Sequence, residues 1–241
     1  MSKLSDFKLL SFDVYGTLID WERGILDALR PSLEKAGKID LDPKHILGVC
    51  HTLEASEQSA NPQLIYSQLL TRLHPKLCRE LGLQEPTEEE SKRFGDNVGE
   101  WPAFPDSVQA LKRLSKVYKM VVLSNVDNTS FSASNAGPLA GFEWDLVLTA
   151  QDIGSYKPST KNFEYMLRQV KEKFGVEKDQ VLQTAQSQFH DHHPARDIGI
   201  KSCWIYRPDV IMGNRENPVS NWKFDTLAEM ADAVEEELSE G

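Results

Sequence analysis

The sequence predicts an α/β protein with a doubly wound, Rossmann-like parallel sheet as its core and an inserted helical cap subdomain. Two patterns lead to this prediction. From Trp101 onward, short apolar runs alternate with helical stripes, which is typical of a parallel sheet with right-handed crossovers. Residues 22–99 contain helical patterns and no convincing strand. We therefore predict a core of residues 1–20 and 100–241, with the helical cap over residues 21–99.

The first strand of the predicted core ends in an acidic residue. Leu9, Leu10 and Phe12 form an apolar run that leads into Asp13, and Gly16 then breaks the run. This pattern predicts a buried strand followed by a tight turn. Ligands of open α/β sheets bind beyond the carboxyl ends of the strands, so Asp13 is a candidate for chemistry. The alternative is that Asp13 only caps the turn, a position where Asp is common.

The insertion reads as a series of helices with recognisable ends. Asp42-Pro43 is a good N-cap and first-turn pair, and Asn61-Pro62 predicts the start of another helix. Gly82 is expected to end that helix. Thr87 with Glu90 forms a capping-box signature for a short acidic helix.

The second part of the core repeats a strand and helix pattern. We expect strands at residues 119–125, 145–150, 181–185 and 202–206. A helical stripe from Phe163 is expected to stop at Gly175. Thr226 with Glu229 predicts the start of the final helix.

Composition excludes some classes of function. The net charge of -10 and a pI of about 5.1 argue against nucleic-acid binding, which usually requires a basic face. The three cysteines are far apart and odd in number, which favours a reducing, cytoplasmic location over a disulfide framework or a zinc site. We see no signal peptide and no membrane span, and expect no membrane partner.

Several polar residues are expected to meet at one edge of the sheet. Asp13, Ser124, Asn125 and Lys157, together with the polar run after Ala185, all follow predicted strands or lie in the loops beyond them. Carboxyl ends of parallel strands lie on one edge, so these segments should converge. Each residue alone also has a simpler interpretation, because Ser and Asn cap helices well and a lone lysine is usually a solvated surface charge.

Four of these segments resemble the motifs of the haloacid dehalogenase superfamily, in the form found in type II 2-haloacid dehalogenases. The first is Asp-x-Tyr-Gly-Thr at residues 13–17, the second Ser124-Asn125 and the third Lys157-Pro158. Asp191, by its spacing to Pro194-Ala195, matches the acid of the fourth motif. The resemblance covers nearly the whole chain and implies the same core and cap layout.

The resemblance implies a mechanism in two steps without a metal or other cofactor. Asp13 attacks the carbon that bears the halogen of a small organic acid, and water assisted by Asp191 then hydrolyses the resulting ester. Thr17, Ser124 and Lys157 would hold Asp13 and the substrate carboxylate, and Asn125 would face the leaving halide. The cap would exclude water from the site.

A magnesium-dependent phosphatase is the alternative enzyme class. The phosphatases of this superfamily carry a second aspartate where this chain has Tyr15, and usually an acid where it has Gln186. A weak magnesium site would then consist of Asp13, the Tyr15 position, Asp191 and backbone carbonyls. A third possibility is a descendant without catalysis that binds a small acid or a protein.

The chain also departs from the type II enzymes. No Trp-Arg pair matches their cap arginine, and residues 51–58 occupy that region. Phe163 replaces a tyrosine, and Gln186 and Gln188 replace a serine and an asparagine of the fourth motif. We count Tyr15, Gln186 and Gln188 among the substrate-binding candidates. A homodimer is expected from the resemblance alone.

The fourth segment is rich in histidine. His190, His192 and His193 surround Asp191, but adjacent side chains do not converge on a single metal ion. We therefore expect one of them, His190, to line the substrate pocket, and the others to be structural or solvent-exposed.

Overall fold

The computed structural model describes residues 2–61, 64–212 and 217–240 and has an all-parallel sheet at its centre. The six strands lie in the order β3-β2-β1-β4-β5-β6. Their bounds are β1 Leu9–Phe12, β2 Lys119–Ser124, β3 Leu146–Thr149, β4 Val181–Ala185, β5 Lys201–Ile205 and β6 Trp222–Phe224. The order reverses beside β1, and such a reversal opens a crevice at the carboxyl ends of the strands. The predicted doubly wound α/β fold is confirmed.

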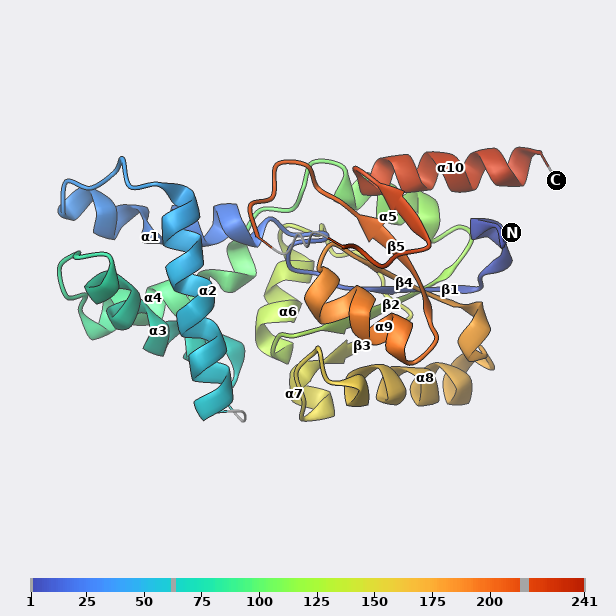
Figure 1. Ribbon diagram of the computed structural model, residues 1–241, viewed down its shortest axis with the longest axis horizontal. Coiled ribbons are helices and arrows are strands. Elements are labelled where there is room, and N and C mark those ends of the chain that lie inside the picture. The colour runs from blue at the N-terminus through green and yellow to red at the C-terminus, as the bar shows by residue number, and fades with distance from the viewer. Residues whose placement is uncertain (1, 62–63, 213–216, 241) are drawn as a thin grey trace.

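Helices cover both faces of this sheet (Figure 1). Helices α5 (Ser107–Leu114) and α10 (Leu227–Ser239) pack on one face, and α8 (Thr160–Phe174) and α9 (His193–Asp197) on the other. Successive residues of β1 serve opposite faces: Leu10 and Phe12 belong to the first apolar cluster and Leu9 to the second. Because both faces are covered, all four residues of β1 are buried, which explains its almost wholly apolar sequence.

Short elements complete the core. Helices α6 (Asn128–Ala136) and α7 (Ala150–Ile153) follow β2 and β3. The remaining turns of helix are η1 Leu4–Asp6, η2 Asn97–Glu100, η3 Lys178–Gln180 and the π-helical turn η4 Gln188–His192. No helix within the described ranges is long and apolar enough to cross a membrane.

Four helices between β1 and α5 gather beside the sheet, on the left of Figure 1. We call α1 (Trp21–Lys35), α2 (Pro43–Ala60), α3 (Tyr66–Glu80) and α4 (Glu88–Asp96) the cap helices. The chain enters and leaves this group at one place, because the Asp20 N–H donates to Pro102 O at 2.8 Å. The two connecting segments therefore lie side by side, as an insertion into the core requires.

Most predicted helix ends agree with the structure, and one is wrong. The Thr87 and Glu90 capping box opens α4, and Thr226 caps α10. The predicted helix start at Asn61-Pro62 is incorrect: Asn61 ends α2 by donating its N–H to Glu57 O, and α3 begins only at Tyr66. Pro62 itself lies outside the described residues.

Candidate active site

Asp13 lies directly beyond β1, where a tight turn redirects the chain. Gly16 has φ +96, a conformation that favours glycine, and lets the turn close. Both carboxylate oxygens of Asp13 are held: Oδ2 accepts from Thr17 Oγ1 at 2.6 Å and Oδ1 from Lys157 Nζ at 2.9 Å. Thr17 Oγ1 in turn accepts from the Gln186 N–H at 2.9 Å. The first and fourth predicted motifs are thus joined through one hydroxyl group.

Lys157 is buried and donates to three oxygens. Nζ lies 2.9 Å from Asp13 Oδ1, 2.7 Å from Asp191 Oδ1 and 2.9 Å from Leu123 O. Burial alone lowers the pKa of the lysine, but the two carboxylates offset this and its pKa is raised. The ammonium is therefore retained beside Asp13.

Asp191 contacts the same ammonium, with its Oδ1 2.7 Å from Lys157 Nζ. It is fully buried, and its Oδ1 accepts from Gln183 Nε2 at 2.9 Å as well as from Lys157. Burial raises the pKa of this carboxyl despite the adjacent cation. Its Oδ2 has no hydrogen-bond partner among the described residues. Gln183 was not among the predicted site residues, although a glutamine inside the apolar strand at residues 181–185 is a visible signal.

A cavity of about 810 Å³ opens above Asp13, between the carboxyl edge of the sheet and the cap helices. Seven of the predicted site residues line it: Asp13, Tyr15, Ser124, Asn125, Lys157, Gln186 and His190. Thr17, Asp191 and Gln188 do not. Thr17 and Asp191 contact the site through Asp13 and Lys157. Gln188 is buried elsewhere, and its Oε1 accepts from the Val219 N–H at 3.0 Å.

The residues of the second motif differ in what they offer to a ligand. The Asn125 side chain is engaged by the main chain of Lys157, donating to its carbonyl at 2.9 Å and accepting from its N–H at 2.7 Å. Ser124 Oγ is buried and lacks a hydrogen-bond partner within the described part of the chain. A buried hydroxyl without a partner is unfavourable, so Ser124 is the better placed of the two to bind a substrate oxygen.

Tyr15 and His190, two of the predicted substrate-binding residues, each lie within hydrogen-bond distance of a serine side chain. The Tyr15 hydroxyl pairs with Ser134 Oγ at 2.8 Å, and burial raises the pKa of this tyrosine. His190 lines the cavity and its Nδ1 lies 3.2 Å from Ser187 Oγ. His192 is buried between Ala185 O and Ser202 Oγ, each at 2.9 Å.

The donor set around Asp13 does not fit a magnesium ion. A metal that bridged Asp13 and Asp191 through their Oδ1 atoms would have to displace Lys157 Nζ, which contacts both. Gln186 supplies no anionic oxygen, and its Nε2 donates to Met212 O at 3.2 Å. Across residues 2–61, 64–212 and 217–240, no group of three acidic, histidine or cysteine side chains is arranged to hold a metal.

A buried arginine that was not predicted from the sequence, Arg207, supports the turn after Asp13. Arg207 Nη2 donates to Thr17 O at 2.8 Å, and its Nη1 pairs with Asp106 Oδ1 at 2.6 Å. The arginine thereby fixes the carbonyl of the residue that holds Asp13. A charged residue just after a strand was a weak signal in the sequence, because surface arginines are common at such positions.

Comparisons with known proteins show the family of the chain. The family model described as haloacid dehalogenase-like hydrolase matches residues 7–182. A search of curated protein sequences gives no match.

Three solved structures illustrate the fold. A defluorinating L-2-haloacid dehalogenase matches with TM-score 0.77 and 18% identity, over 98% of this chain and 99% of that one. The L-2-haloacid dehalogenase of Xanthobacter autotrophicus, with chloropropionic acid covalently bound, matches with TM-score 0.76 and 18% identity, over 95% and 98%. A magnesium-bound putative hydrolase of the superfamily from Bacillus subtilis matches with TM-score 0.72 and 17% identity, over 95% and 99%.

At such identities these structures support the fold alone, and they include both dehalogenases and a magnesium-bound hydrolase. The family model, which covers most of the chain, carries the assignment. This chain belongs to the haloacid dehalogenase-like hydrolase family.

Proposed function

We propose that the protein is a metal-independent hydrolytic dehalogenase that acts on 2-haloacids through a covalent ester on Asp13. The observation that carries this proposal is the position of the Lys157 ammonium, which lies between Asp13 and Asp191. The ammonium holds Oδ1 of Asp13 at 2.9 Å, which orients this carboxylate for attack on carbon. The same cation contacts the Oδ1 atom of both carboxylates, so a metal would have to compete with it for these atoms.

In the first step, a carboxylate oxygen of Asp13 forms a bond to C2 of the substrate. The carbon–halogen bond breaks, and the halide leaves with the electron pair. Ser124 Oγ donates a hydrogen bond to the substrate carboxylate, since it is otherwise unsatisfied at the cavity wall. Thr17 and Lys157 hold the attacking carboxylate in place, which supplies much of the rate enhancement through orientation.

In the second step, water attacks the carbonyl carbon of the Asp13 ester. Asp191 accepts the proton of that water through its unpartnered Oδ2, and its raised pKa favours this role as a base near neutral pH. The ester bond breaks and the 2-hydroxy acid leaves with that proton. The second proton of the water is released to solvent, and Asp13 is again a carboxylate.

The leaving group favours this reaction over phosphoester hydrolysis. A halide departs without a proton, whereas an alkoxide needs an acid. Tyr15, which stands where the phosphatases carry their acid, pairs with Ser134 and has a raised pKa. The covalently bound chloropropionic acid of the Xanthobacter enzyme is consistent with an ester route in a protein of this fold.

The test is halide release from 2-chloropropionate, with and without a chelator, by the parent and by Asp13→Asn. We expect release that ignores the chelator and disappears in the variant. Asp197→Asn, an exposed acid paired with Arg196, is the matched control and should keep parental activity. In ¹⁸O-labelled water, repeated turnover should place the label in the peptide that carries Asp13.

Two results would overturn the proposal. One is the absence of halide release together with chelator-sensitive hydrolysis of an aryl phosphate, which would point to the phosphatase class. The other is halide release that places ¹⁸O only in the product after many turnovers, which would mean that water attacks the substrate directly.

A further inference from the structure

The cavity is walled on its cap side by one polar face of helix α2. The residues of α2 that line it are His51, Glu54, Ala55, Gln58 and Ser59. Their spacing of three and four residues places them on one side of the helix. The apolar residues of the same helix, Ile46, Leu47 and Cys50, are buried in the cap instead. The apolar packing of α2 into the cap thus uses other positions than those that line the cavity.

Glu54 is the acidic residue of this wall and is held in position. Gln58 Nε2 donates to its Oε1 at 3.3 Å, and the Tyr66 hydroxyl forms a side-chain hydrogen bond with it. Withdrawal from water raises the pKa of Glu54 to about 7. Tyr66 also lines the cavity and packs edge-on against Trp101. A carboxyl group is thus fixed across the cavity from Asp13.

The charges of the cavity orient a substrate. Among the lysines and arginines that the structure describes, Lys157 is the one that lines the cavity, and it lies on the sheet side with Ser124. On that side the unpartnered Ser124 Oγ offers a hydrogen bond to a substrate carboxylate, whereas the ionised form of Glu54 repels one. The end of the substrate that reaches α2 must instead satisfy a hydrogen-bond acceptor.

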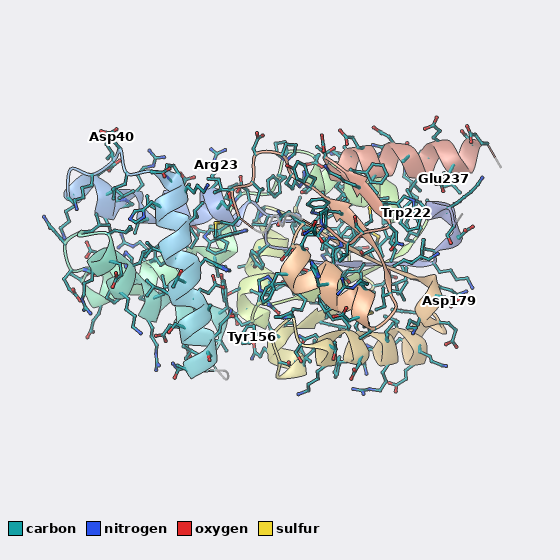
Figure 2. All side chains as sticks on the ribbon, viewed as in Figure 1. Arg23, Asp40, Tyr156, Asp179, Trp222 and Glu237 are labelled. Carbon is teal, nitrogen blue, oxygen red and sulfur yellow. The ribbon has the colours of Figure 1, made fainter. Side chains whose placement is uncertain are left out.

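The size of the cavity favours a substrate that is long enough to reach α2. At about 810 Å³ it falls within the range of roughly 300–1,000 Å³ found for pockets that hold drug-sized ligands. A three-carbon haloacid would fill only a small part of it. Tyr156, at the boundary between the cap helices and the core in Figure 2, donates to Leu64 O at 2.9 Å and helps to hold the cap against the core.

We propose that Glu54 is a specificity-determining residue, and that the substrate is a longer 2-substituted acid whose far end carries a hydrogen-bond donor, hydroxyl or amino, that Glu54 binds. Turnover of such a substrate rests on the function proposed above. Binding of its far end by Glu54 does not, because binding of an unreactive acid tests it separately.

The turnover test compares 2-chloropropionate, 2-chlorohexanoate, 2-chloro-6-hydroxyhexanoate and 2-chloro-6-aminohexanoate. We expect the parent to prefer the hydroxylated or aminated six-carbon acid over 2-chlorohexanoate by at least tenfold in kcat/KM, mainly through KM. Glu54→Leu should reverse this preference. Glu54→Gln should retain preference for the hydroxyl group but lose that for the amino group, because a neutral amide accepts a hydrogen bond without attracting a cation. Glu80→Gln, an exposed acid of α3, is the control and should behave as the parent.

The binding test uses acids without a leaving group. The parent should bind 6-hydroxyhexanoate or 6-aminohexanoate more tightly than hexanoate in calorimetry, and Glu54→Leu should abolish the difference. Equal binding of the three acids by the parent, or an unchanged preference in Glu54→Leu, would overturn the inference. The expected binding preference without halide release from any chloroacid would overturn the dehalogenase proposal and leave the role of Glu54 standing.

Discussion

The side chain of Asn125 exchanges two hydrogen bonds with the main chain of Lys157. Its Nδ2 donates to the lysine carbonyl at 2.9 Å, and its Oδ1 accepts from the lysine N–H at 2.7 Å. Asn125 follows β2 and Lys157 lies in the loop before α8, so the pair ties together two edges of the site. The resemblance to type II dehalogenases led us to expect Asn125 to face a halide. In the structure, its amide positions the loop that carries the lysine.

This pairing predicts the effect of removing the amide. Asn125→Ala should lower kcat by at least tenfold, because the Lys157 loop loses both anchors and the ammonium shifts relative to Asp13. Stability should fall by about 1–3 kcal/mol, as expected for two lost hydrogen bonds. Halide release and urea unfolding measure the two effects.

Asn135→Ala is the matched control for that variant. Asn135 also makes two side-chain hydrogen bonds, with Phe142 O and Trp144 Nε1, but it does not line the cavity. A similar loss of stability with activity near that of the parent is expected. If both variants lost activity equally, the positioning role of Asn125 would be refuted.

Lys157→Met should abolish activity and also destabilise the fold. The variant leaves Asp13 and Asp191 buried without their shared cation, and breaking a buried pair in this way costs about 3–5 kcal/mol. Adding Asp191→Asn should recover part of the lost stability without restoring activity. Urea unfolding of the single and double variants tests the coupling, and purely additive effects would contradict the shared-cation geometry.

Asp191→Asn should separate the two proposed steps. Attack by Asp13 does not need this base, so one equivalent of halide should be released rapidly. Hydrolysis of the ester should then slow by at least a hundredfold, since general-base catalysis contributes about 10²–10⁴-fold. Rapid-quench halide measurement and mass spectrometry of the Asp13 peptide detect the trapped ester. An unchanged steady-state rate would remove Asp191 from the mechanism.

The buried His192 predicts acid sensitivity of the fold. Ala185 O can only accept a hydrogen bond, so His192 Nε2 carries the hydrogen and Nδ1 accepts from Ser202 Oγ. Burial lowers the pKa of His192 from 6.5 to about 4. Between these values the unfolded chain binds a proton that the folded chain excludes, so the free energy of unfolding falls as the pH drops from about 6.5 to 4.

The size of this contribution is up to roughly 3 kcal/mol, since each pKa unit corresponds to about 1.4 kcal/mol. His192→Gln should be less stable than the parent at pH 7 and should lose less stability on acidification to pH 5. Urea unfolding at the two pH values measures the difference. Parallel pH dependence of parent and variant would show that His192 does not contribute.

The local pattern of the chain was sufficient for the fold and for the approximate position of the site. Alternating apolar runs predicted five of the strands, and the polar residues after them predicted which sheet edge carries Asp13, Ser124 and Lys157. The short edge strand β6 was missed because its residues are partly exposed and show no apolar run. Helix α6 was missed because its sequence has little amphipathic character.

Hydrogen-bond partners within the site, by contrast, were decided by tertiary packing. Asp13 and Lys157 are 144 positions apart, and only the assembled sheet brings Lys157 Nζ within 2.9 Å of Asp13 Oδ1. Leu123 O and Asp191 Oδ1 are the other two oxygens that this ammonium contacts. Gln188 was expected at the substrate and is buried away from it, because the turn of η4 directs it toward Val219.

The sequence by itself determined the α/β class, the acid at the end of the first strand and the family motifs, because periodicity and residue type are local properties. The tertiary structure alone decided that Asn125 holds a loop, that Gln183 contacts Asp191 and that Glu54 faces the cavity. Such contacts depend on how cap and core elements pack, and shifts of an ångström or two make or break a hydrogen bond.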